Sequence, residues 1–160
     1  MKLSADEAYR QYADRVFAAA FSVCKNQADA DDAVQDTFIK YQQTGTDFTD
    51  ETHLKAWLLR VAINRATDIT RAFWRRNKVS WEDYMDTLTF EEPDDKGLFE
   101  AVMRLPDKYR AVIHLFYYED YSVKEIAGLL NRGEGTVKSQ LSRGRALLKS
   151  ELTEEWDDDE

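Results

Sequence analysis

The sequence predicts an all-α protein of two small helical domains joined by an acidic linker. Apolar residues recur every three or four positions along most of the 160-residue chain, which is the period of an α-helix. Only two prolines interrupt the pattern, and 43% of the residues are hydrophobic, enough to bury helical cores. Acidic residues around Pro93 separate two such periodic regions. The predicted parts are a domain at 1–77, a linker at 78–96, a domain at 97–152 and an acidic tail at 153–160.

Three amphipathic helices account for the first domain. The first runs from about Ser4 to Cys24, and the second starts near Asp29, where carboxylates favour the positive end of the helix dipole. The third and longest runs from about Glu51 to Arg76. Its predicted buried stripe consists of Leu54, Trp57, Leu58, Val61, Ala62, Ile69, Ala72 and Phe73.

The outward side of this third helix is basic. Arg60, Asn64, Asp68, Arg71 and Arg75 follow one another at steps of three and four residues. The helix ends in Phe73-Trp74-Arg75-Arg76, which combines stacking and phosphate-binding groups of the kind that contact single strands. A purely solvated face would carry mixed charges without this positive bias.

Four helices are predicted for the second domain. Leu98, Phe99, Val102 and Met103 indicate a short helix ending near Leu105. Pro106 opens the next helix, with Tyr109, Val112, Ile113, Phe116 and Tyr117 predicted to be buried. The segment from Tyr121 to Lys149 then reads as two helices joined by a turn at Gly133, with Ser122 and Glu125 forming a capping box.

The last of these helices has one apolar and one polar face. Val137, Leu141, Gly144 and Leu148 share the first, which leaves Lys138, Ser139, Ser142, Arg143 and Ala146 on the second. A small, basic and hydroxylated face suits the major groove of DNA. We therefore predict a helix-turn-helix; the alternative, an ordinary surface helical hairpin, does not account for the basic outward face.

Net charge alternates along the chain. The total of −9 divides into −5 for residues 1–52, +6 for 53–81, −7 for 82–120, +3 for 121–152 and −6 for the tail. The two basic blocks coincide with the third helix and with the helix-turn-helix. Because phosphate neutralisation is local, both blocks are candidate DNA contacts despite the acidic total.

Other residue types exclude several functions. The single cysteine, Cys24, cannot form an internal disulfide and is expected to be a small apolar residue on a helix face. His53 and His114 have no Cys or His at ligand spacing, so we expect neither a metal nor a cofactor. No apolar run follows Met1 or reaches the ~20 residues that span a bilayer. The sequence predicts a cytoplasmic protein without membrane insertion.

Acidic residues of the second helix allow two interpretations. Asp32, Gln35, Asp36 and Lys40 lie opposite the apolar stripe of Val34, Phe38 and Tyr41. They serve either solvation and helix capping or the docking of a partner helix. Spacing alone favours solvation and capping.

Three stretches of the chain are diagnostic when they occur together. They are Asp32-Ala33-Val34-Gln35-Asp36-Thr37-Phe38, Trp57-Leu58-Leu59-Arg60-Val61-Ala62-Ile63-Asn64 and Gly135-Thr136-Val137-Lys138-Ser139. In this order they resemble the extracytoplasmic-function group of the sigma-70 class of bacterial sigma factors. The similarity extends over roughly Ala8 to Leu152. It implies a non-enzymatic initiation factor that binds core RNA polymerase and directs it to promoter DNA, in a stress or envelope-signal response.

The resemblance also implies roles for particular residues. Core docking, on the coiled coil of the largest polymerase subunit, would use Asp32, Gln35, Asp36 and Phe38. The polymerase flap would be a further contact. The −10 element, with a base extruded from the melted strand, would contact Phe48, Asn64, Asp68, Arg60, Arg65, Arg71, Arg75 and Arg76. The −35 element would contact Thr136, Lys138, Ser139, Ser142 and Arg143. An anti-sigma factor would cover these surfaces, and the acidic linker would thread a polymerase channel.

The turn and the tail depart from this resemblance. Where relatives have a glycine followed by an apolar residue, this chain has Asn131-Arg132-Gly133. Arg132 cannot fill the core as an aliphatic side chain would, although Asn131 tolerates a left-handed conformation. Residues Glu154 to Glu160 are expected to form a disordered, solvated tail.

Two other functional classes remain as alternatives. A stand-alone helix-turn-helix regulator would leave the first basic block unexplained and would need a dimer interface. A helical adaptor that does not bind DNA would leave both basic faces unexplained.

Overall fold

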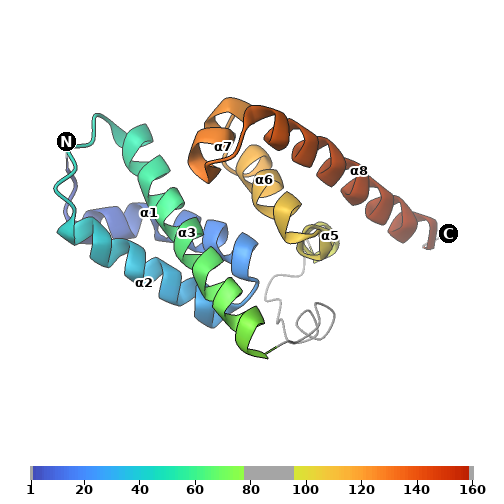
Figure 1. Cartoon of the computed structure of the whole chain (residues 1–160), viewed down its shortest axis with the longest axis horizontal. Coiled ribbons are helices and arrows are strands. Elements are labelled where there is room, and N and C mark those ends of the chain that lie inside the picture. Colours follow the sequence, from blue (N-terminus) through green and yellow to red (C-terminus); the bar gives the residue numbers. More distant parts are fainter. Residues whose placement is uncertain (1, 78–95, 159–160) are drawn as a thin grey trace. The chain divides into compact units, whose positions relative to one another are not determined.

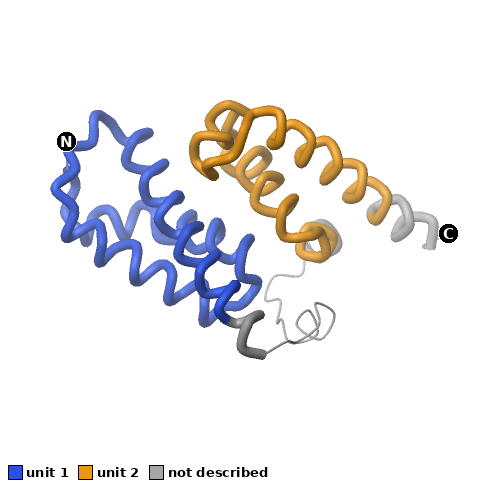
Figure 2. The backbone as a smooth tube through the Cα atoms, viewed as in Figure 1, with its two compact units in different colours: residues 1–80 blue, residues 81–160 orange. Residues whose placement is uncertain are grey.

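The protein forms two compact helical units, residues 1–80 and 81–160 (Figures 1 and 2). The computed structural model describes residues 2–77 and 96–158, and the side chains of residues 2–72 and 100–151. All the elements in these ranges are α-helices. The predicted all-α class with two helical domains is confirmed, while 78–95 of the predicted linker lie outside the described residues.

Seven helices make up the described parts of the two units. The first unit contains α1 (Ala5–Cys24), α2 (Gln27–Gln43) and α3 (Glu51–Asn77), and the second contains α5 (Lys96–Arg104), α6 (Asp107–Tyr117), α7 (Val123–Leu130) and α8 (Glu134–Asp158). None of these helices is long and apolar enough to cross a membrane.

Side-chain caps fix the turn between α1 and α2. The Asn26 Oδ1 accepts a hydrogen bond from the Asp29 amide at 2.9 Å, which satisfies a free donor at the start of α2. Lys25, immediately before it, adopts the left-handed conformation with φ 55° and ends α1. Ser4 caps α1 in the same way, through a 3.2 Å bond from the Glu7 amide.

Helix α3 packs against both α1 and α2 (Figure 1). For this reason its buried stripe is wider than a single helix face and differs from the predicted one. Leu59, Ile63 and Ala66 are buried in addition to Leu54, Leu58 and Ala62, whereas Trp57, Val61, Ile69 and Ala72 are only half-buried. The predicted burial of Phe73 concerns a side chain outside the described ones.

The second unit is built around the contact of α6 with α8. A Cβ added to Gly144 of α8 would lie 3.1 Å from Ile113 Cγ1 and 3.3 Å from Tyr109 Cβ, so glycine is what permits the close approach of α6. The buried Arg110 donates to the Leu105 carbonyl at 2.9 Å and to Asp107 Oδ1 at 3.0 Å, which fixes the turn from α5 into α6.

Three predictions for this unit are wrong. Phe116 was predicted to be buried but is only half-buried, near the end of α6. Tyr117 was predicted to be buried but is 49% exposed, because it lies at the end of α6, where its hydroxyl accepts a 2.6 Å bond from Arg145 Nε. The tail was predicted to be disordered, but α8 continues to Asp158. In the first unit, by contrast, Cys24 is buried on α1 as a small residue of the helix, as predicted.

Candidate nucleic-acid interface

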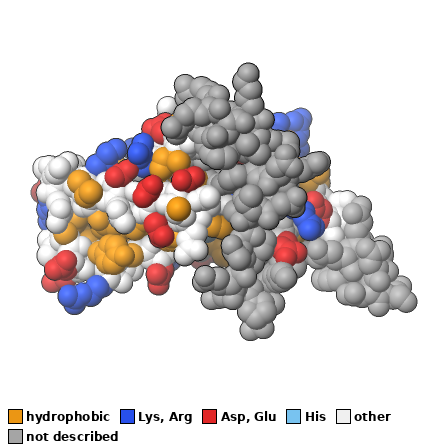
Figure 3. Space-filling view, turned by 90° about the horizontal axis from the view of Figure 1, so that it is seen from below, with side chains coloured by type: hydrophobic (Ala, Val, Ile, Leu, Met, Phe, Trp, Pro, Cys, Tyr) orange, Lys and Arg blue, Asp and Glu red, His pale blue; other side chains and the backbone are white. Residues whose placement is uncertain are grey.

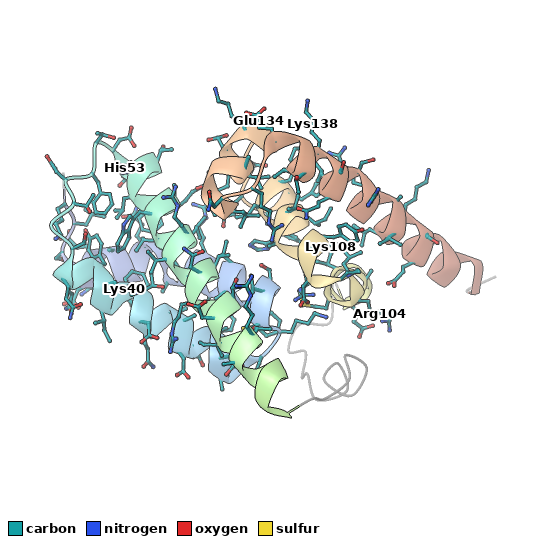
Figure 4. The ribbon with its side chains drawn as sticks, viewed as in Figure 1. Lys40, His53, Arg104, Lys108, Glu134 and Lys138 are labelled. Atoms are coloured by element: carbon teal, nitrogen blue, oxygen red, sulfur yellow. The ribbon has the colours of Figure 1, made fainter. Side chains whose placement is uncertain are left out.

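The N-terminal half of α8 presents the first candidate interface. Val137, Leu141 and Gly144 are buried on one face, as predicted. All five residues predicted to contact the −35 element are exposed on the other side, namely Thr136, Lys138, Ser139, Ser142 and Arg143. Figure 4 shows Lys138 projecting away from the ribbon of α8. The structure therefore gathers hydroxyl and cationic donors on one helix face.

A capping box starts α7, the first helix of the pair. Ser122 Oγ accepts from the Glu125 amide at 3.1 Å, and Glu125 Oε1 accepts from the Ser122 amide at 3.0 Å. These reciprocal bonds, which the sequence predicted, satisfy two free donors at the helix start.

Hydrogen bonds from Arg132 stabilise the turn between α7 and α8. Asn131 takes the left-handed conformation that the sequence allowed, with φ 54° and ψ 49°. The half-buried Arg132 donates from Nη1 to the Lys108 carbonyl at 3.2 Å and to Gln140 Oε1 at 2.8 Å. It thereby ties α6 to α8 in place of the expected aliphatic side chain. Burial lowers the pKa of the Arg132 guanidinium, yet a guanidinium stays charged at neutral pH.

The outer face of α3 forms the second candidate interface. Arg60, Asn64, Asp68 and Arg71 are all exposed along it. Arg75 belongs to the same helix, but its side chain and that of Arg76 lie outside the described ones. The face thus combines cations with an amide and a carboxylate, which can donate to or accept from base edges.

Arg65 lies at the edge of this face and joins two sets of predicted residues. Its Nε donates to Asp36 Oδ2 of α2 at 2.6 Å, and the two side chains remain 42% and 38% exposed. Arg65 was predicted to hold −10 DNA, and Asp36 to dock polymerase. In this structure they are bonded to each other, a link that helix spacing did not reveal.

Phe48 differs from its predicted role as a DNA contact. Its side chain is 1% exposed and belongs to an aromatic cluster, with ring centroids 6.0 Å from Tyr41, 5.1 Å from His53 and 5.7 Å from Trp57. The enclosed ring of Phe48 presents no exposed face in this structure. Phe48 instead fixes the loop that leads into α3.

The α2 surface contains most of the predicted docking residues. Asp32 and Gln35 are exposed, and Asp36 is half-buried beside Arg65. Phe38 is only 8% exposed, because its ring packs edge-on against Tyr9 with centroids 5.2 Å apart. It supports the surface from beneath rather than forming part of it.

Ile39 is the exposed apolar residue that the sequence analysis missed on this surface. Its side chain is 50% exposed and follows Asp32, Gln35 and Asp36 at helical spacing. Its seven-residue separation from Asp32 was a signal that could have found it. Figure 3 shows acidic and hydrophobic side chains interspersed on one side of the first unit.

The acidic start of α2 also affects its own electrostatics. Burial, and then the negative charge of Asp32, raise the pKa of Asp29. The α2 surface combines the carboxylates of Asp32 and Asp36 with the exposed side chain of Ile39, and this mixture suits a protein partner better than nucleic acid.

Comparison with known proteins places both units in one family. The family model described as Sigma-70 region 2 matches residues 8–78, and that described as Sigma-70, region 4 matches residues 97–148. Helix α3 thus falls in the first match, and the helix-turn-helix falls in the second.

Two curated relatives are similar to this chain along most of its length. The ECF RNA polymerase sigma factor SigE of Mycolicibacterium smegmatis is 34% identical over 92% of this chain, which spans 61% of the length of SigE. The RNA polymerase sigma factor SigV of Bacillus subtilis is 31% identical, over 85% of this chain and 83% of SigV.

A solved structure has the same fold. The sigma factor RpoE of Bartonella quintana, crystallised with the anti-sigma factor NepR, matches with a TM-score of 0.71 at 24% identity, over 92% of this chain and 96% of that chain. The chain therefore belongs to the extracytoplasmic-function group of RNA polymerase sigma factors within the sigma-70 family.

Proposed function

We propose that this protein binds core RNA polymerase and directs it to specific promoters, in response to a stress or envelope signal. The observation that carries the proposal is the presence of two separate exposed faces rich in DNA-binding groups, one on α3 and one on α8, each in its own folded unit. Sigma factors are non-enzymatic regulatory proteins, and we assign no catalytic residue or cofactor to this one.

The two units bind different elements of the promoter. Domain 1–77 docks on polymerase through α2 and reads and melts the −10 element through the outer face of α3. Domain 97–152 reads the −35 element through α8, joined to the first by the linker 78–96. For core docking we now add Ile39 to Asp32, Gln35 and Asp36, and treat Phe38 and Phe48 as positioning residues because both are buried.

An anti-sigma factor is the regulatory partner that we propose. The matched RpoE structure contains such a partner, although at 24% identity the likeness speaks for the fold alone. The α2 face, acidic through Asp32 and Asp36 and with exposed Ile39, has the chemistry of a protein-binding surface, which supports binding to polymerase or to an inhibitor there. We place the protein in the cytoplasm, where its polymerase partner acts.

Transcription in vitro tests the function directly. Core polymerase with and without this protein is given fragmented genomic DNA, and the 5′ ends of the transcripts are sequenced. We expect start sites that share two upstream elements and that depend on the protein.

The rival function predicts a different result. A stand-alone regulator would bind specific duplex DNA tightly without polymerase, whereas we expect the free protein to bind duplex weakly. Tight, specific binding by the free protein, together with no dependence of transcript starts on it, would contradict the proposal.

A further inference from the structure

A groove between α6 and α8 lies beside the −35 reading face. It has a volume of about 320 Å³, and Lys108 and the buried ring of Tyr109 form its α6 wall. Thr136, Ser139, Gln140 and Arg143 form the α8 wall. Three of these four α8 residues were predicted to contact DNA, whereas Lys108 and Gln140 were not. The groove is therefore continuous with the proposed DNA-binding face but extends onto another helix.

Its walls consist mainly of hydrogen-bond donors. Lys108 and Arg143 supply cations from opposite walls, and both side chains are exposed. The hydroxyls of Thr136 and Ser139 can donate as well. Gln140 uses its Oε1 to accept from Arg132 at 2.8 Å, which leaves its amide NH₂ as the free end. Such a set of donors suits an anion that only accepts hydrogen bonds.

One carboxylate close to the groove, that of Asp107, is already paired. Asp107, next to Lys108 in sequence, accepts from Arg110 at 3.0 Å. The Lys108 ammonium lies 5.1 Å from the centroid of the Tyr109 ring, so it is held near the groove without an acidic partner in this contact. The half-buried Arg132, bonded to the Lys108 carbonyl, adds a third positive charge behind the wall.

We propose that this groove seats one backbone phosphate of the −35 DNA and that Lys108 is a positioning residue which contacts that phosphate. The inference rests on the proposed function and adds to it a contact made from outside the helix-turn-helix. A lysine ammonium acts as a point charge and cannot make the bidentate contacts that distinguish bases. A contact from Lys108 to a phosphate would therefore fix the position of the protein along the DNA without specifying sequence. Arg143, on the opposite wall, remains free to reach a base edge.

The test uses the whole protein bound to core polymerase, and promoter duplexes taken from the mapped start sites. Single methylphosphonates replace each phosphate of the −35 element in turn, which removes one negative charge at a time. For the unmodified protein we expect affinity to fall roughly 5- to 10-fold at one or two positions at about 0.1 M salt. For Lys108→Ala we expect a similar loss on unmodified DNA and no further loss at those same positions.

Salt dependence and matched variants complete the experiment. The slope of log affinity against log salt should decrease by about one for Lys108→Ala, equally for all promoter sequences. Lys108→Arg should retain the unmodified protein's affinity. Arg10→Ala, which removes one exposed positive charge from the first unit, should leave the methylphosphonate pattern unchanged.

Different results overturn different claims. If the unmodified protein with core polymerase selects no promoter, the proposed function fails. If it selects promoters but Lys108→Ala keeps the same affinity, slope and methylphosphonate pattern, only the phosphate site fails. A change in the preferred −35 sequence for Lys108→Ala would also overturn it, because a phosphate contact carries no base information.

Discussion

The two proposed DNA-reading helices, α3 and α8, differ in how much their neighbours determine the reading face. On α8 all five predicted residues project from one helix, and Val137, Leu141 and Gly144 attach that helix from the opposite side. On α3 the helix packs between α1 and α2, and its edge residue Arg65 is bonded to Asp36 of α2. The chemistry of the α8 face is thus set by α8 itself, whereas that of the α3 face also depends on α2 and on the loop before α3.

The largest expected effect tests this dependence at Phe48. Phe48→Ala removes a fully buried ring that lies against Tyr41, His53 and Trp57, so it should lower the free energy of unfolding of the first unit by about 3–5 kcal/mol. Residue-resolved amide hydrogen exchange should show lost protection in α1, α2 and α3, with α6 and α8 unchanged.

A matched variant separates stability from DNA contact. Asn64→Ala, at an exposed position of the same α3, should change stability by less than about 0.5 kcal/mol. Full protection in Phe48→Ala combined with lost promoter opening would restore Phe48 as a direct DNA contact, as the sequence predicted.

Acid should affect the second unit through His114. This side chain is 8% exposed, and burial lowers its pKa from 6.5 to about 4. Below about pH 6.5, His114 is therefore protonated in the unfolded chain but stays neutral in the folded state until the pH approaches 4. Above pH 6.5, His114 should not change the free energy of unfolding. Between pH 6.5 and 4, the free energy of unfolding should fall by about 3 kcal/mol in total.

The comparison of His114 with phenylalanine isolates this effect. His114→Phe retains an aromatic ring in contact with Tyr118 but cannot be protonated. Denaturant titrations at several pH values should show that the variant lacks the loss between pH 6.5 and 4. Parallel pH profiles for the two proteins would mean that His114 is protonated equally easily in the folded state.

Arg143 and Asn64 test whether the two faces read different elements. Arg143→Ala should weaken binding to the −35 element by about 1–3 kcal/mol if the side chain makes a bidentate base contact. Asn64→Ala should alter preference within the −10 element and leave core polymerase binding intact. Both are measured as holoenzyme affinities on promoters with single base changes.

Two outcomes would contradict the assignment of the two helix faces to different promoter elements. If Arg143→Ala leaves the preference for −35 sequences unchanged, Arg143 does not contact a base. Loss of core binding in Asn64→Ala would place that residue in the docking surface or in the structural core.

Helix periodicity predicted the parts of the site that a single helix determines. The spacing of Val137, Leu141 and Gly144 identified the buried side of α8, and the exposed stripe of α3 from Arg60 to Arg71 was predicted equally well. Both faces follow from the 3.6-residue repeat alone.

Periodicity could not predict contacts between elements. Phe48 lies in a loop, where no repeat indicates burial, and its enclosure depends on Tyr41 and Trp57 from two helices. Phe38 was placed on the docking surface because the family motif contains it, yet Tyr9 of α1 covers it. The Lys108 groove arises only where α6 and α8 meet.

The smallest expected effect concerns the Arg65–Asp36 pair, which most distinguishes the α3 edge from the α8 face. Both side chains are more than one-third exposed, so solvent screens their attraction despite the 2.6 Å separation. A double-mutant cycle of Arg65→Gln and Asp36→Asn, followed by denaturant unfolding, should give a coupling free energy below about 1 kcal/mol. The coupling should decrease further in high salt.

A weak pair has a functional consequence for both partners. With a weak coupling, the proposed roles cost the fold little, because Arg65 can leave Asp36 for a DNA phosphate and Asp36 can turn to polymerase. A coupling above about 2 kcal/mol would instead make the pair a structural link between α2 and α3. Arg65 would then be held away from DNA in the free protein, and the α3 face would depend on docking at α2 to complete its set of cations.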